Sequence, residues 1–220
     1  MLRTRRTTQT EAFDGIMPPE RQFSQVRDED IYEELCHTLP AAPFLRVRRG
    51  KVHTCDMGSS QHKLAPSSLR CVSSRWGRGG GRVTWQGQPV GDIVVHGGSW
   101  FRSERLLEFR VNGRPVMTMR VHNIHNDQPC QYVIRVAGGP TLRMAMPRWI
   151  EKRQVYLLRY LLISTKKVGI ESCKNFSLRN RQDEAVLECI KVEKDALLVA
   201  TKPPFNTVLG AVIGFMRFYV

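Results

Sequence analysis

The sequence predicts a mainly β fold, an antiparallel barrel or sandwich of about ten to twelve strands that encloses a hydrophobic C-terminal helix. Three observations support this prediction. From Pro43 onward, short runs of alternating apolar and polar residues are separated by turn residues. Asn112-Gly113 stands between two such runs and favours a tight hairpin, because both central residues need positive φ. Residues 205–220 are apolar on every side of a helix, so they need a wrapper, and a barrel of this many strands is wide enough to provide one.

The strands are expected in an order set by alternation and turn residues. Residues 44–53, 69–72, 81–85 and 90–96 form the first strands, with a turn at 87–89. Three hairpins follow, 106–111 with 116–121, 132–136 with 141–146, and 176–179 with 186–192, before a last strand at 196–201. The apolar run 154–163 fits either a helix or a strand.

The C-terminal helix is expected over residues 206–218. Pro203 and Pro204 end the preceding segment, and Asn206 or Thr207 can cap the first turn with a side-chain oxygen. A bilayer core needs about 20 apolar residues, whereas this run is shorter and Arg217 interrupts it. We therefore expect the protein itself to enclose the helix, with a membrane tail anchor as the alternative.

Residues 1–42 are expected to form an N-terminal arm, separate from a barrel-like domain at 43–220. The arm begins with the basic, hydroxyl-rich segment 1–10, which lacks the apolar face of an amphipathic helix. A plain basic arm is therefore favoured over a mitochondrial presequence. Residues 28–38 carry an acidic cluster and one short helix, which is either a solvated face or a segment that folds over the basic body.

The net charge of +14, from 34 basic and 20 acidic residues, predicts an anionic partner. Nucleic acid, an anionic membrane surface and an acidic protein all satisfy this requirement. The six cysteines show no Cys-x-x-Cys spacing and follow no secretory signal, which predicts reduced thiols in an intracellular protein.

Two groups of basic residues are the candidate anion- or lipid-binding sites. The first group is Arg46, Arg48, Arg49 and Lys51. Spacing by two puts Arg46 and Arg48 on one face of a strand, where guanidinium groups can hold phosphates through paired hydrogen bonds. The second group surrounds Trp149 and consists of Arg143, Arg148, Lys152 and Arg153, with Arg159 nearby. Trp149 beside arginines indicates an interfacial anchor, a nucleic-acid platform or a core tryptophan with a basic rim.

Metal and enzyme sites find little support in the sequence. His53 and Cys55 share a strand face, but His122 and His125 do not, so no zinc ligand set is assembled. No local signature of a nucleophilic site and no paired carboxylates in an apolar context are present, which leaves general acid–base chemistry little to work with. The glycine-rich segment 76–82 contains an Arg-Gly-Gly motif, which is typical of RNA binding. Because the motif occurs in a single copy, a loop between strands is favoured. No catalytic residue, metal or cofactor is expected.

Three stretches near the end of the chain resemble the tubby-like superfamily and, within it, the phospholipid scramblases. Asn175-Phe-Ser-Leu-Arg-Asn180 and Glu184-Ala-Val-Leu-Glu-Cys-Ile-Lys191 resemble paired strands of that family, and Leu209–Tyr219 resembles its terminal helix. The hairpin at 107–121 is similar to an earlier one. The resemblance implies a barrel around a buried helix, with a basic face for phosphoinositide head groups. It does not extend to the acidic calcium-binding-like segment, because residues 196–205 here contain no acid.

Two functions follow as hypotheses. The first is a non-enzymatic, peripheral membrane protein that binds anionic lipid, such as a phosphoinositide, at the cytoplasmic face of membranes. The second is a nucleic-acid-associated structural protein, such as a viral capsid or matrix-like protein with a basic arm, whose binding would fall steeply with salt.

Overall fold

Residues 42–74, 79–96, 104–122, 130–139, 142–145, 147–153, 155–158, 160–163, 172 and 175–220 are described by a computed structural model. The main sheet consists of β1 (Phe44–Arg48), β2 (Val52–Ser60), β3 (Lys63–Ser73), β4 (Gly80–Trp85), β5 (Gln88–His96), β6 (Arg105–Val111), β7 (Arg114–His122), β8 (Gln131–Val136), β9 (Arg143–Ala145), β12 (Phe176–Arg179), β13 (Ala185–Glu193) and β14 (Ala196–Thr201). A separate pair is formed by β10 (Arg148–Ile150) and β11 (Val155–Leu157), with η1 (Glu151–Arg153) between them. Helix α2 (Thr207–Met216) and η2 (Arg217–Tyr219) end the chain.

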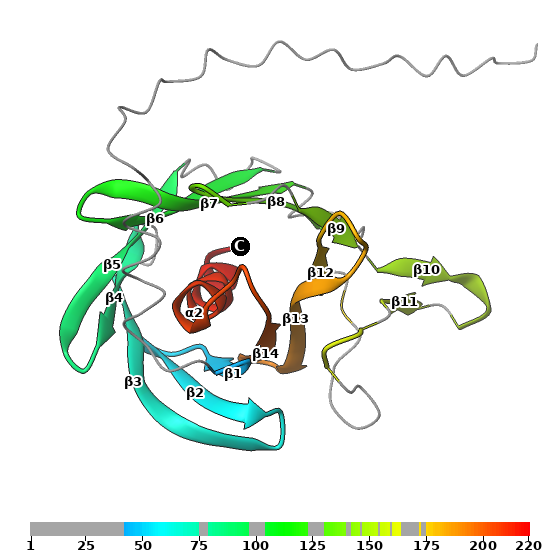
Figure 1. The fold of residues 1–220 in the computed structure, drawn as a ribbon, viewed down its shortest axis with the longest axis horizontal. Helices are drawn as coiled ribbons and strands as arrows, with labels where there is room; N and C mark the ends of the chain where they lie inside the picture. The colour runs from blue at the N-terminus through cyan, green and yellow to red at the C-terminus, as the bar shows by residue number, and fades with distance from the viewer. Residues whose placement is uncertain are drawn as a thin grey trace, which may run out of the picture.

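The twelve-stranded antiparallel sheet curls into a nearly closed barrel around α2, as Figure 1 shows in a view along the barrel axis. Its strand order is β8-β7-β6-β5-β4-β3-β2-β1-β14-β13-β12-β9, so β1, the first strand, pairs with β14, the last. The predicted barrel is confirmed, and the sandwich alternative is not formed.

The seam of the barrel lies between β8 and β9, which are the two edges of the sheet. The predicted hairpin of 132–136 with 141–146 is therefore wrong: within the described residues no strand ladder joins β8 to β9, and β9 pairs with β12. One contact that crosses the seam is the backbone N–H of Tyr132, which lies 2.9 Å from Sδ of Met144. The chain passes from one edge of the barrel to the other because the curvature brings these two edges together.

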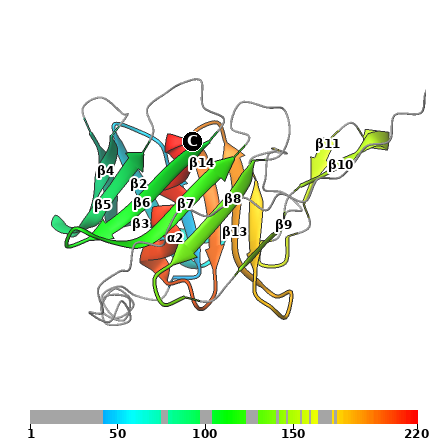
Figure 2. The ribbon, with the colours of Figure 1, turned by 90° about the horizontal axis from the view of Figure 1, so that it is seen from above.

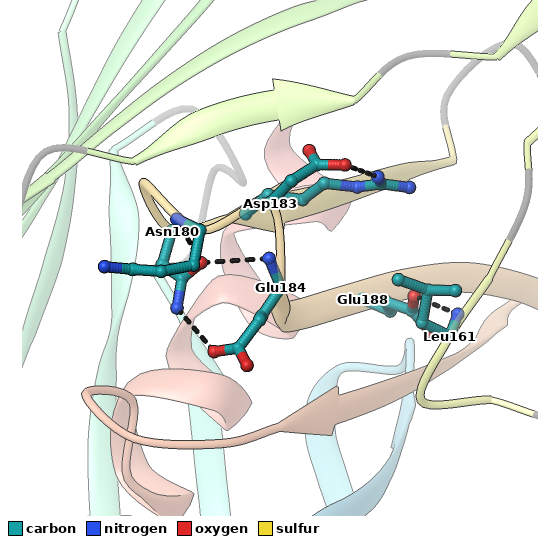
Figure 3. Close-up of polar contacts among 7 residues, drawn as sticks. Leu161, Asn180, Asp183, Glu184 and Glu188 are labelled. Atoms are coloured by element: carbon teal, nitrogen blue, oxygen red, sulfur yellow. Dashed lines mark hydrogen bonds and ion pairs between the residues drawn. The ribbon is translucent and has the colours of Figure 1, made fainter.

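The other two predicted hairpins are formed. Strands β6 and β7 pair across Asn112 and Gly113, whose φ angles of 50° and 77° are the positive values that this turn requires. Strands β12 and β13 pair across a turn in which Oδ1 of Asn180 accepts the backbone N–H groups of Gln182 and Glu184. Figure 3 shows this turn, including the contact between Asn180 and Glu184.

Helix α2 is enclosed by the barrel, as predicted. All ten of its residues are buried, and the side chain of Asn206 caps it by accepting the backbone N–H of Leu209 at 2.8 Å. Glycines at 210 and 214 allow the helix to lie close to β1, because a Cβ at either position would meet Leu45 or Val47. No helix within the described residues is long and apolar enough to cross a bilayer. The tail-anchor alternative does not apply to a helix buried in this way.

Several predicted strand boundaries were wrong. Residues 44–53 do not form one strand: β1 ends at Arg48, the chain turns at residues 49–51, and β2 runs back antiparallel beside β1. Strands β2 and β3 are longer than predicted and have irregular register near Asp56 and its partner Pro66. Among the described residues of the run 154–163, residues 155–157 form the short strand β11 and the chain bends at 161–163. The predicted arm, apart from Ala42, and its helix at 28–38 lie outside the described residues.

Candidate anion-binding site

The first basic group lies on the outside of the barrel wall at β1. The side chains of Leu45 and Val47 are fully buried towards α2, so the alternation of the strand turns Arg46 and Arg48 outward. Arg49 and Lys51 follow in the exposed turn before β2. The shared face of Arg46 and Arg48 is as predicted, whereas their binding role stays a prediction.

The neighbours of these arginines hold them in place. Nη1 of Arg48 lies 3.2 Å from Oδ2 of Asp56, while 47% of the Arg48 side chain remains exposed. Asp56 is also the register partner of Arg46 on β2. Nε of Arg46 is buried and has no hydrogen-bond partner in the described part of the chain. The backbone N–H of Arg49 donates to the carbonyl of Asp195 at 2.8 Å, which fixes the end of β1 to the β13–β14 turn.

The second basic group lies elsewhere on the molecule. Arg143 is in β9, Arg148 is in β10, Arg153 is in η1, and Lys152 in η1 is exposed. The side chains of Arg143, Arg148 and Arg153, and all of Arg159, lie outside the described part. Strands β14, β13 and β12 separate β1 from β9 in the sheet, so Arg143 does not lie beside the first group.

Trp149 is not a core residue, because 47% of it is exposed on β10. The interpretation as a core tryptophan with a basic rim is therefore wrong. The sequence could not decide this point, since the pair of β10 and β11 stands apart from the main sheet (Figure 2).

Sequence reasoning missed a buried carboxylate on the outer side of β13. Glu188 is 0% exposed, and its oxygens accept the backbone N–H groups of Leu161, Leu162 and Ile163 at 2.6, 2.9 and 2.9 Å. Figure 3 shows Leu161 facing Glu188 across this contact. Burial raises the pKa of Glu188, although the three N–H groups and the charge of Arg179 oppose the rise. With both oxygens occupied and no solvent access, this carboxyl fastens residues 161–163 to the barrel and is unsuited to proton transfer.

A histidine–serine pair at one end of the barrel also proves to be structural. Nε2 of His53 lies 3.2 Å from Oγ of Ser73, which lies 3.1 Å from the hydroxyl of Tyr219. The backbone N–H of Gly50 donates to Nδ1 of His53, so this network places the imidazole proton on Nε2, facing the serine. His53 therefore donates to Ser73 and cannot accept its proton, which is the step a nucleophilic serine requires.

The cysteines and Arg217 line the interior of the barrel. Cys55, Cys71, Cys130 and Cys189 are buried and form no disulfide, and burial raises the pKa of Cys71 and Cys189 to about 11, which suppresses their reactivity. Arg217 is 7% exposed, with its guanidinium 5.2 Å from the ring centre of Tyr132. Burial opposes its charge, but Tyr132 and the neighbouring thiols together raise its pKa. Within the described residues, no group of three or more metal-ligating side chains is assembled.

Comparison with known proteins adds no relatives. No family model matches the chain, and no curated protein matches it in sequence.

Proposed function

We propose that this protein binds anionic lipid head groups, such as phosphoinositides, through the outward basic face of β1, as a non-enzymatic peripheral membrane protein. The observation that carries the proposal is the placement of Arg46 and Arg48 side by side on the outer wall, with Arg49 and Lys51 exposed beside them. A net charge of +14 favours approach to any anionic surface.

The architecture supports the same proposal. The resemblance of the last segments to tubby-like proteins and phospholipid scramblases implies a barrel around a terminal helix with a basic outer face. An enclosed helix and an outward arginine pair are both features of this molecule. We accordingly propose membership of that superfamily, with lipid binding rather than calcium-triggered lipid transport as the activity.

The test is co-sedimentation of the purified chain with vesicles. Phosphatidylcholine vesicles with and without phosphatidylinositol bisphosphate are compared, in the presence of excess nucleic acid. The double variant Arg46→Gln/Arg48→Gln should bind the anionic vesicles about 30-fold more weakly, because each basic residue near an anionic surface contributes about 1 kcal/mol.

A matched control is available on the opposite wall of the barrel. Arg120 and Arg135 are exposed on β7 and β8 and face outward, so Arg120→Gln/Arg135→Gln removes the same charge from a different face. The proposal expects this control to bind nearly as well as the wild type. Equal loss in both variants would mean that net charge alone drives binding. Loss of pelleting to the nucleic-acid competitor would favour the nucleic-acid-associated structural protein.

A further inference from the structure

The β10–β11 pair projects from the barrel in both Figure 1 and Figure 2. Two apolar side chains on or just after this pair are exposed to solvent. Trp149 on β10 is 47% exposed, and Leu161 beyond β11 is 49% exposed. Tryptophan is highly buried on average, so a half-exposed ring on a projecting hairpin points to a contact made outside the molecule.

Residues 161–163, which follow β11, are fastened to the outer wall of the barrel. Glu188 accepts three successive backbone N–H groups from Leu161 to Ile163. Ile163 is 3% exposed and belongs to an outer apolar cluster with Ile190, Leu198 and Ala200 of β13 and β14. The backbone of residues 161–163 is thus fixed on the wall, which holds the Leu161 side chain in an outward position.

The fastening point lies next to the basic face. Leu198, part of the apolar cluster beneath residues 160–163, is the register partner of Arg46 on β1. Phe44 of β1 packs against the same cluster. Exposed Leu161 and the outward arginines therefore occupy neighbouring parts of one side of the barrel.

We infer that the β10–β11 pair and residues 160–163 form a membrane-contact arm, in which the Trp149 ring and the Leu161 side chain enter the boundary between head groups and acyl chains. The inference rests on the proposed lipid-binding function and extends it from head-group binding to insertion. Indole rings prefer this boundary, and lysine beside them, here the exposed Lys152, extends its charge to the phosphates. The basic neighbourhood and the net charge favour an anionic lipid surface as the occupant over a protein.

The decisive variant is Trp149→Ala/Leu161→Ala, measured with the same bisphosphate-containing vesicles. We expect binding to weaken about tenfold, because the variant lacks apolar side-chain area that the wild type transfers from water into the lipid. The matched control is Val133→Ala on β8, an apolar side chain that is 45% exposed on another part of the wall, and it should leave binding unchanged. Both positions are half-exposed, so thermal melting should show that the variants stay folded.

Tryptophan fluorescence provides an independent readout of insertion. Emission of the wild type should shift to the blue on vesicles and be quenched by brominated acyl chains, and Trp149→Phe should lose this quenching. Wild-type binding by Trp149→Ala/Leu161→Ala would overturn the arm while leaving the proposed function in place. A second result would also overturn the membrane-contact arm. The double variant would bind vesicles more weakly, but the wild type would show no acyl-chain quenching and would bind single-stranded nucleic acid, which would favour base stacking on Trp149. Absence of vesicle binding by the wild type would remove the proposed function and this inference together.

Discussion

At the scale of single residues, the interior is arranged around close approach between α2 and β1. A Cβ at Gly214 would lie 2.6 Å from Cγ2 of Val47 and 3.4 Å from Cγ2 of Val199. Valine side chains are stiff at χ1, so neither neighbour can move aside easily. Glycine at this position therefore reflects packing and not a need for unusual backbone angles.

Gly214→Ala should consequently lower the free energy of unfolding, by up to about 2 kcal/mol. Alanine ordinarily stabilises a helix interior by about 1 kcal/mol relative to glycine, but overpacking a full core costs about 1–3 kcal/mol. Urea unfolding of Gly214→Ala, Val47→Ala and the double variant tests this expectation. The double variant should be more stable than the sum of the single effects predicts. A gain of stability in Gly214→Ala alone would show that the helix has room to shift.

His53 should make stability depend on pH. Burial, and then the charge of Arg49, lower its pKa from the ordinary value of 6.5. Between the lowered pKa and 6.5 the unfolded chain binds more protons than the folded one, so stability falls as the pH drops below about 6.5. His53→Gln keeps a donor towards Ser73 and should remove this part of the slope, measured as unfolding free energy between pH 5 and 8. An unchanged slope would assign the pH dependence to other groups.

At the scale of elements, α2 supplies a large part of the core. Its six large apolar side chains are buried: Val208, Leu209, Val212, Ile213, Phe215 and Met216. At about 1.5–3 kcal/mol for each side chain, their burial is comparable to the entire stability of an ordinary domain.

Truncation after Pro204 should therefore unfold the barrel. Far-ultraviolet circular dichroism and gel filtration of the truncated chain should show loss of the cooperative transition and aggregation. A chain ending at Met216 is the informative comparison, because it keeps α2 and loses only η2 with its contact from Tyr219 to Ser73. A folded, soluble protein without α2 would mean that the helix is dispensable to the barrel.

The elements that sequence reasoning found are those with a local physical signal. The Asn112-Gly113 turn and the all-apolar helix can be predicted from the sequence, because the backbone angles of a turn and the apolar surface of a helix are local properties. Strand β2 gave a weak signal, since Gly58, Ser59 and Ser60 make its end polar and the alternation of 44–53 continues through the turn. The bend at 161–163 depends on Glu188, which lies 25 residues further along the chain than Ile163, and no local pattern could reveal it.

The candidate site was predictable to the same extent. That Arg46 and Arg48 share a face follows from the period of a strand. Two further contacts follow only from the register of β2 and β14 with β1. Asp56 holds Arg48, and the apolar cluster under residues 160–163 adjoins Arg46. The exposure of Trp149 could not be predicted, because it depends on the position of β10 and β11 outside the main sheet.

At the scale of the whole molecule, the seam between β8 and β9 is the weak line of the barrel. Every other strand of the main sheet has a hydrogen-bonded neighbour on both sides, whereas β8 pairs only with β7 and β9 only with β12 within the described residues. Unpaired edges open at lower free energy than paired strands.

Amide hydrogen exchange should reveal this line. Protection should be lowest in β8 and β9 among the twelve strands and highest in β1 and β14, which are paired on both sides and pack against α2. Uniform protection around the barrel would indicate that the seam is closed by contacts as strong as a strand ladder.

The position of α2 in the chain also sets the order in which the protein can be made. The helix that fills the barrel follows the fourteen strands of the described chain, and β1 pairs on its second side with β14. The ribosome therefore synthesises the strands of the barrel wall before α2. The apolar inner faces of the early strands stay exposed until synthesis has passed residue 216. Long-range pairing of this kind is slow and exposes the chain to aggregation. Nascent chains of this protein should accordingly depend on chaperones until the last helix emerges.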